Sequence, residues 1–186
     1  MFYTARIIGI GSYVPEKVLT NKDLEKLVET NDEWIVERTG IEERRISKEG
    51  VETADMMATE AAKRAIEDCG INPEEIDLLL VASTTTNLIC PTISCVVQAR
   101  IGAKNAFCYD LNNACPGFLS AFSTAEAYFE AGMAKKALIV GTEVTSNYVD
   151  WTDRGTCILF GDGAGACVLE AKEVNTKEEV NTVIMH

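Results

Sequence analysis

Residues 106–131 read AFCYDLNNACPGFLSAFSTAEAYFEA and place Cys115 between a short apolar run and a long helical stretch. The apolar run at 106–111 predicts a strand, and the stretch 116–131 predicts a helix that is apolar on nearly every side and therefore central. Pro116 suits the start of that helix, because the N–H that proline lacks needs no partner in a first turn. The segment thus predicts a strand, a turn that carries Cys115, and a helix.

A cysteine in such a turn can act as a nucleophile. Its thiol would face the positive end of the helix dipole, which favours the thiolate. The turn also lies at the carboxyl edge of the sheet, where open α/β sheets bind ligands. Gly117 would let a backbone or a ligand approach closely. A small buried cysteine of the core is the alternative, and position alone does not decide between the two.

Strands and helices alternate along the rest of the chain. We expect further strands at 6–10, 77–82 and 137–141, and a hairpin of 156–160 and 166–169 around the turn 161–165. We expect helices at 22–28, 33–38, 54–69 and 92–101, with Asn21, Asp32 and Thr53 at their starts and Gly40, Gly70 and Gly102 past their ends. Residues 11–15 and 172–179 are expected in loops. This order predicts one α/β domain, a sheet with helices on its faces.

Composition argues against several classes of protein. A length of 186 residues, 47% hydrophobic and 25% charged, is that of an ordinary globular domain. With 29 acidic against 17 basic residues the net charge is −12, which disfavours nucleic-acid binding. Seven scattered cysteines and one histidine, His186, disfavour a metal site. No start segment resembles a signal peptide, and polar residues and Pro91 interrupt the uncharged stretch 78–99, so we expect a cytoplasmic protein without a membrane span.

The glycine-rich sequence GDGAG at 161–165 invites comparison with a phosphate-binding loop. A dinucleotide loop must open a helix whose N-terminus meets the pyrophosphate. Here an apolar, strand-like run follows, and Asp-Gly between two apolar runs is typical of a hairpin turn. We therefore expect a turn and no dinucleotide site.

Four motifs carry a family resemblance across essentially the whole chain. The sequence DLNNACPGF at 110–118 resembles the nucleophile segment of β-ketoacyl-acyl-carrier-protein synthase III. GIGSYVP at 9–15, NDEWIVERTGI at 31–41, and WTDRGT at 151–156 followed by FGDGAGA at 160–166 are similar to its other landmarks. The resemblance implies the thiolase-like fold, in which two similar α/β halves form five αβαβα layers. Residues 1–186 would be the first half, a single domain carrying the nucleophile.

By this resemblance the complete protein is an acyltransferase of fatty-acid synthesis. Cys115 would accept the acyl group of acyl-CoA and then condense it with malonyl-acyl-carrier-protein, and its own N–H would stabilise the oxyanion. Trp34 and Arg154 match positions that sandwich the CoA adenine, and Thr30 and Arg38 match neighbouring contacts. The family implies a homodimer that takes CoA thioesters as substrates and holds no permanent cofactor.

Two departures and three alternatives stay open. Pro116 stands where the family usually has serine, and the family's catalytic His and Asn belong to a second half that this sequence lacks. The chain by itself is therefore expected to be inactive. The protein could be another CoA-dependent condensing enzyme, of the hydroxymethylglutaryl-CoA or polyketide-priming type, or a non-catalytic module for dimerisation or CoA binding. Trp34 taken alone would sooner be a packing residue of its helix, and the match of Arg154 favours the ligand role.

Overall fold

A mixed five-stranded sheet, in the order β1-β7-β6-β4-β5, forms the centre of the computed structural model, which describes residues 2–86 and 88–176. The strands are β1 (Phe2–Tyr13), β2 (Val18–Thr20), β3 (Glu43–Arg45), β4 (Leu78–Ala82), β5 (Phe107–Leu111), β6 (Lys136–Val144) and β7 (Asp162–Val174). Strands β5, β4 and β6 run parallel, and β7 is antiparallel to both β6 and β1. Strands β2 and β3 form a separate pair.

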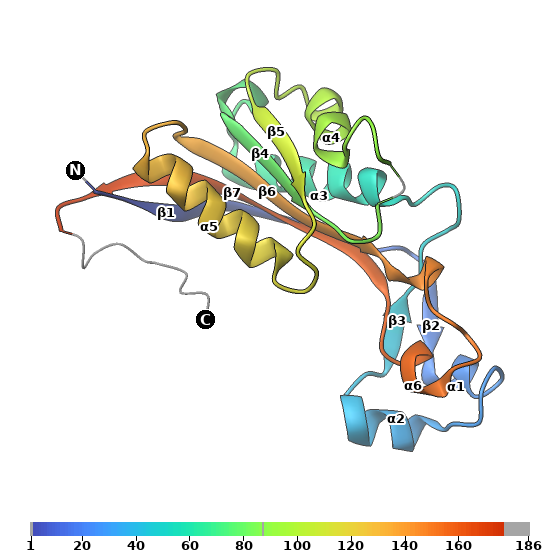
Figure 1. Cartoon of the computed structure of the whole chain (residues 1–186). Coiled ribbons are helices and arrows are strands. Elements are labelled where there is room, and N and C mark those ends of the chain that lie inside the picture. Colours follow the sequence, from blue (N-terminus) through green and yellow to red (C-terminus); the bar gives the residue numbers. More distant parts are fainter. Residues whose placement is uncertain (1, 87, 177–186) are drawn as a thin grey trace.

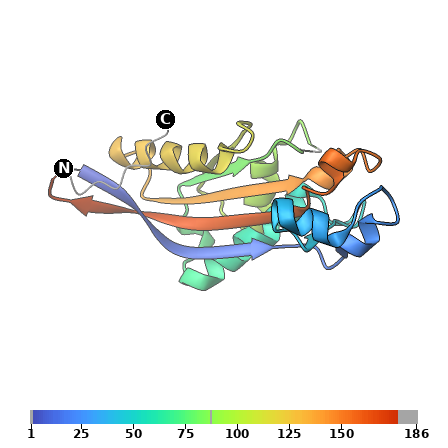
Figure 2. The same cartoon turned by 90° about the horizontal axis from the view of Figure 1, so that it is seen from below.

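Helices cover both faces of this sheet (Figure 2). The helices are α1 (Asn21–Leu24), α2 (Asp32–Thr39), α3 (Ala54–Cys69), α4 (Ile93–Ile101), α5 (Gly117–Glu130) and α6 (Arg154–Cys157), with 3-10 turns at Pro73–Glu75 and Thr145–Asn147. Helices α3 and α4 pack on one face and α5 on the other. Every residue of β4 is buried, because Leu79 and Val81 face the first layer while Leu78 and Leu80 face the second. This confirms the doubly covered strand expected near 77–82.

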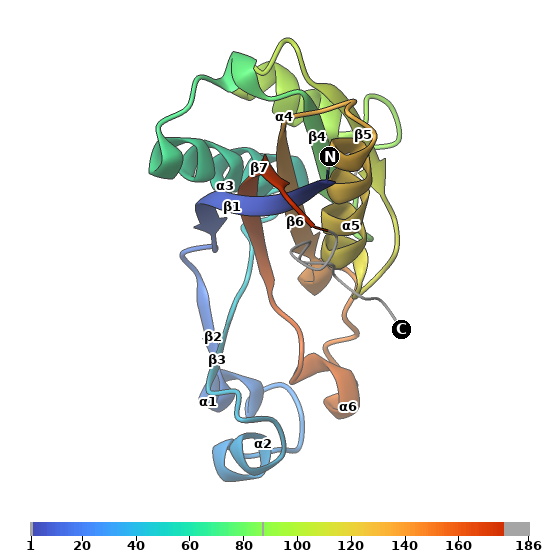
Figure 3. The same cartoon turned by 90° about the vertical axis from the view of Figure 1, so that its left-hand side faces the viewer.

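A smaller group of elements lies beyond one end of the sheet. Helices α1, α2 and α6 gather there around β2 and β3 (Figures 1 and 3). Their own small core contains Leu24, Ile35, Cys157 and Ile158. Parts of the chain more than a hundred residues apart thus meet in this group. No helix of residues 2–86 and 88–176 is long and apolar enough to cross a bilayer.

Helix α3 lies directly against the backbone of β1. A Cβ atom on Gly9 would stand 2.4 Å from the carbonyl oxygen of Ala65, and one on Gly11 would stand 2.3 Å from that of Ala61. The helix presents small alanines to these glycines, which explains the alanine-rich face of the sequence. Its bounds agree with the predicted 54–69, although the side chain of Thr53 makes no capping hydrogen bond.

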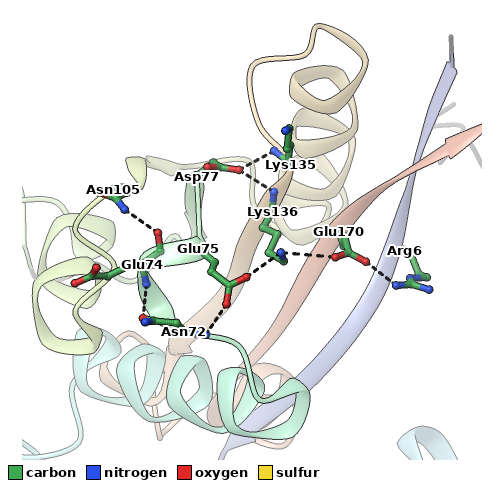
Figure 4. A network of polar contacts seen from close by, with 9 residues as sticks. All are labelled: Arg6, Asn72, Glu74, Glu75, Asp77, Asn105, Lys135, Lys136 and Glu170. Atoms are coloured by element: carbon green, nitrogen blue, oxygen red, sulfur yellow. Dashed lines mark hydrogen bonds and ion pairs between the residues drawn. The ribbon is translucent and has the colours of Figure 1, made fainter.

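Polar contacts fix the amino-terminal edge of the parallel strands (Figure 4). Asp77, just before β4, accepts a hydrogen bond from the N–H of Lys136 at 3.0 Å. The Lys136 ammonium lies 3.0 Å from Glu75 and 3.7 Å from Glu170, and Glu170 pairs with Arg6 at 2.6 Å. The hydrogen bond to Glu75 raises the pKa of Lys136. These contacts tie the segment before β4 to β6, β7 and β1 at the edge opposite Cys115.

The prediction of a hairpin around residues 161–165 is wrong. Residues 154–157 form helix α6, and β7 runs without interruption from Asp162 to Val174. Asp162 does not turn the chain but is buried, and its carboxylate accepts hydrogen bonds from the N–H of Ser47 at 2.7 Å and of Ser146 at 2.9 Å. Because β7 finds partners on both sides, extended pairing outweighs the local preference of Asp-Gly for a turn.

Three further expectations change. Residues 11–13, expected in a loop, extend β1 by pairing with 164–166 of β7, and residues 172–174 pair with the start of β1. The remainder of the expected loop, 177–179, and His186 lie outside the described residues. The helix expected at 22–28 is confined to α1, and Thr20, not Asn21, caps it in a capping box with Asp23.

Helix α5 is less enclosed than its composition predicts. Ala121, Ala125 and Phe129 are buried against the sheet, but Leu119 is 49% exposed. The apolar residues therefore divide into a face that packs on the sheet and a face that is open in this chain. The predicted ends of α2 and α4 are confirmed by the left-handed backbone of Gly40 and Gly102.

Candidate functional site

Cys115 lies in the turn between β5 and α5, as its sequence context predicts. Ala114 has a φ of 47°, and the N–H of Gly117 donates to the carbonyl of Ala114 at 2.9 Å, which closes a tight turn around the cysteine. Asn113 steadies the turn by donating to Ser120 Oγ at 2.7 Å. The Cys115 side chain is exposed in this chain, whereas Cys157 and Cys167 are buried.

A hollow of about 440 Å³ opens in front of Cys115. It lies where β4, β5 and β6 end and β7 begins, so the carboxyl edge of the parallel strands forms its floor. Its lining comprises Ala82, Thr84, Thr85, Ala114, Cys115, Phe118, Gly141, Thr142, Glu143, Thr145, Phe160, Gly163, Ala164 and Gly165. Most of these residues are small or apolar, so the thiol faces a surface suited to an uncharged chain.

Small residues bring the start of α5 close to the sheet. A Cβ atom on Gly117 would lie 3.1 Å from that of Ala82, and one on Gly141 would lie 3.3 Å from the ring of Phe118. A larger side chain at either glycine would push the helix start away from the strand ends. Gly117 thus permits the close approach expected from the sequence, and the approaching group is Ala82 of β4.

The wall of the hollow contains a polar clamp that the sequence did not reveal. The Glu143 carboxylate accepts hydrogen bonds from the N–H of Thr84 at 2.9 Å and of Thr85 at 3.1 Å. It also accepts from the Thr85 hydroxyl at 2.5 Å, and that hydroxyl accepts from the N–H of Val144 at 2.7 Å. The carboxylate therefore holds the segment after β4 against the end of β6. The one sequence signal for this clamp was a glutamate at the end of an apolar strand.

Trp34, Arg38 and Arg154 meet in the group beyond the sheet. The guanidinium carbons of Arg38 and Arg154 lie 4.4 and 4.6 Å from the centroid of the Trp34 ring. Both distances are typical of cation–π contacts. Arg154 also donates to the carbonyl of Glu29 at 3.2 Å, next to Thr30, whose hydroxyl oxygen is buried without a hydrogen-bond partner in the described part of the chain. The structure thus gathers the predicted residues from α2, α6 and the segment before α2.

Comparisons with known proteins agree with these motifs. The family model described as 3-oxoacyl-acyl-carrier-protein synthase III matches residues 109–185. The β-ketoacyl-acyl-carrier-protein synthase III of Clostridium acetobutylicum is 55% identical over 172 residues, which are 92% of this chain and 52% of that protein. The chain therefore spans about half the length of the curated relatives that it matches.

Solved structures give the same result. The crystal structure of 3-oxoacyl-acyl-carrier-protein synthase III from Aquifex aeolicus aligns with a TM-score of 0.88 at 49% identity, covering 91% of this chain and 55% of that one. The priming β-ketosynthase of the R1128 polyketide pathway aligns with a TM-score of 0.88 at 39% identity, covering 92% of this chain and 51% of that one.

Proposed function

This chain belongs to the β-ketoacyl-acyl-carrier-protein synthase III family, and from that premise we propose that the full-length protein is an acyltransferase that initiates fatty-acid synthesis. It would take an acyl group from acyl-CoA onto Cys115 and condense it with malonyl-acyl-carrier-protein, with loss of carbon dioxide. The observation that carries the proposal is the exposed Cys115 in its tight turn at the mouth of an apolar hollow. The expected thiolase-like α/β fold is confirmed by the likeness to these synthases, and this chain forms a helix layer, a sheet and a second helix layer.

The proposed acyl transfer uses the geometry of the turn. The Cys115 sulfur would attack the thioester carbonyl carbon, and the CoA thiol would leave when the tetrahedral intermediate collapses. The N–H of Cys115 is one proposed donor to the oxyanion, because a fixed N–H at a helix start needs no reorganisation during the reaction. The apolar lining of the hollow would hold the acyl chain and keep water from the thioester.

We propose that the adenine of CoA binds between Trp34 and Arg154. Two stacked layers need a separation of about 7 Å between ring and guanidinium, so Arg154 would move outward by roughly 2.4 Å from its present 4.6 Å. Arg154 is exposed on the short helix α6, and its carbonyl partner Glu29 is its one hydrogen-bond contact among the described residues. The buried hydroxyl of Thr30 and the guanidinium of Arg38 offer further contacts to the nucleotide.

Replacing Trp34 with alanine is expected to weaken CoA binding to the full-length protein about tenfold or more. Stacking of a base on an aromatic ring contributes roughly 1–3 kcal/mol to binding, and the substitution removes the ring while leaving both arginines. Isothermal titration with CoA measures the change. Trp151→Ala is the matched control, because Trp151 belongs to the same small apolar cluster and lacks an arginine over its ring in the described residues. An unchanged dissociation constant in a folded Trp34→Ala protein would refute the adenine site.

The nature of the acyl acceptor separates the proposed activity from its closest alternative. The full-length protein, given acetyl-CoA, should form a β-ketoacyl product with malonyl-acyl-carrier-protein and none with acetoacetyl-CoA. A hydroxymethylglutaryl product would contradict the proposal. The likeness to a priming β-ketosynthase keeps polyketide priming as the second candidate. A product that is incorporated into a polyketide would favour it. Affinity for CoA without turnover of either acceptor would favour a binding module.

The homodimer, the cytoplasmic location, and inactivity of this chain alone stay predictions.

A further inference from the structure

Two free cysteines from different elements lie side by side on the α3–α4 face of the sheet. Cys95 belongs to α4 and Cys108 to β5, and their sulfur atoms are 3.5 Å apart. A disulfide has a sulfur–sulfur distance of about 2.05 Å, so the two sulfurs would need to approach by roughly 1.5 Å. Both side chains are partly exposed, so a small oxidant can reach them. Neither cysteine belongs to the catalytic turn or to the nucleotide group.

The surroundings of the two thiols differ, and the difference assigns their order of reaction. Cys95 lies in the first turn of α4, and the hydroxyl of Thr92 donates a hydrogen bond to its sulfur at 3.2 Å. Burial and the contact with Cys95 raise the pKa of the Cys108 thiol to about 11, which makes it the less reactive of the two. Cys95 is therefore the thiol that an oxidant meets first, and Cys108 is the neighbour that can resolve the product.

Hydrogen bonds next to the pair hold α4 in a fixed position against β5. The Asp110 carboxylate accepts from the N–H of Ile93 at 2.9 Å and of Ser94 at 2.8 Å, which fixes the start of α4 to β5. Other cysteines have different partners. Cys69, for example, donates to the carbonyl of Ala65 in its own helix at 3.3 Å. The α4–β5 contact is thus a rigid frame that keeps two thiols facing each other.

We propose that Cys95 and Cys108 are an oxidation-sensitive thiol pair that hydrogen peroxide closes into an intrachain disulfide. Peroxide transfers an oxygen atom to the Cys95 sulfur: the O–O bond breaks, an S–O bond forms, and one water leaves. The Cys108 sulfur then attacks the Cys95 sulfur, the S–O bond breaks, and the hydroxyl leaves with the Cys108 proton as a second water. The two thiols lose two electrons in total, and peroxide gains them. A dithiol reductant restores both thiols.

The test is peptide mapping of the full-length protein after mild treatment with hydrogen peroxide and blocking of free thiols. Trypsin cuts after Arg100 and Lys104, so the bridge should join two separate peptides, and fragment sequencing should place it between Cys95 and Cys108. The joined mass should lie about 2 Da below the sum of the two peptides with Cys69, Cys90 and Cys115 blocked and the other two thiols free, for the two lost hydrogens. Dithiothreitol should release them.

Variants distinguish the proposed pair from general oxidation. Cys95→Ser and Cys108→Ala should each abolish the bridge, while Cys69→Ala, also partly exposed, should leave it unchanged. Cys108→Ala should instead leave Cys95 as sulfenic or sulfinic acid. Bridging of Cys90 with Cys115, or separate oxidation of Cys95 and Cys108 in the unmodified protein, would overturn the proposal. Circular dichroism confirms that each variant is folded. Acyl transfer plays no part in this readout, so a failure of the proposed activity and a failure of the thiol pair are distinguishable.

Discussion

Replacement of Cys115 by serine is expected to lower acyl transfer from acetyl-CoA at least about 10³-fold in the full-length protein, because the reaction loses its nucleophile. The hydroxyl of serine is far less acidic than a thiol, so it is a much weaker nucleophile at neutral pH. Brief incubation with labelled acetyl-CoA, followed by proteolysis and mass spectrometry, should find the label on Cys115 of the unmodified protein.

Cys90 provides the internal control for this experiment, because it is the other exposed cysteine among the described residues. A label determined only by accessibility would divide between the two thiols. A label determined by the turn, the helix start and the apolar hollow should appear on Cys115 alone. Equal labelling of both cysteines, or activity that survives Cys115→Ser, would contradict the assigned role. The Cys115→Ser protein should keep its affinity for CoA, since Trp34 and Arg154 lie in a separate group of elements.

Replacement of Gly11 by alanine is expected to destabilise the fold by about 3 kcal/mol or more. The new methyl group would stand 2.3 Å from the carbonyl oxygen of Ala61 and 2.4 Å from the backbone nitrogen of Ala65. These neighbours are backbone atoms of a helix, so they cannot rotate away as a side chain can. Helix α3 must shift from β1, and the apolar layer between them opens. Denaturant unfolding and thermal unfolding of the full-length protein should both show a lower midpoint.

Gly165 is the matched control for Gly11. It lies in β7 opposite Ser12, the residue after Gly11, and a Cβ atom added there would meet nothing within 4 Å. Gly165→Ala should therefore change the unfolding free energy by only about 0.5 kcal/mol, in either direction. If both variants lose stability equally, the cause is the general effect of removing a strand glycine. If neither does, α3 is not held as closely to β1 as the geometry requires.

Local sequence patterns determined much of the secondary structure of this protein. The run that ends before Cys115 and the helix that follows were readable because apolar periodicity and a helix-start proline act within a few residues. The ends of α3 are clear for the same reason, since a small-residue face and Gly70 are features of neighbouring residues. The motifs around Trp34 and Arg154 identified two parts of one group, although they lie far apart in the chain.

Only the tertiary structure decided the features that depend on distant partners. The sequence around Asp162 predicted a turn. Its carboxylate instead accepts hydrogen bonds from the N–H groups of Ser47 and Ser146, and β7 stays extended between β6 and β1. The clamp of Glu143 on Thr84 joins residues that are 59 positions apart. No local pattern specifies such contacts, because a carboxylate has the same propensities whether or not donors reach it from elsewhere. Burial supplies the difference at Asp162: away from water, a carboxylate must find donors, and the fold decides which donors those are.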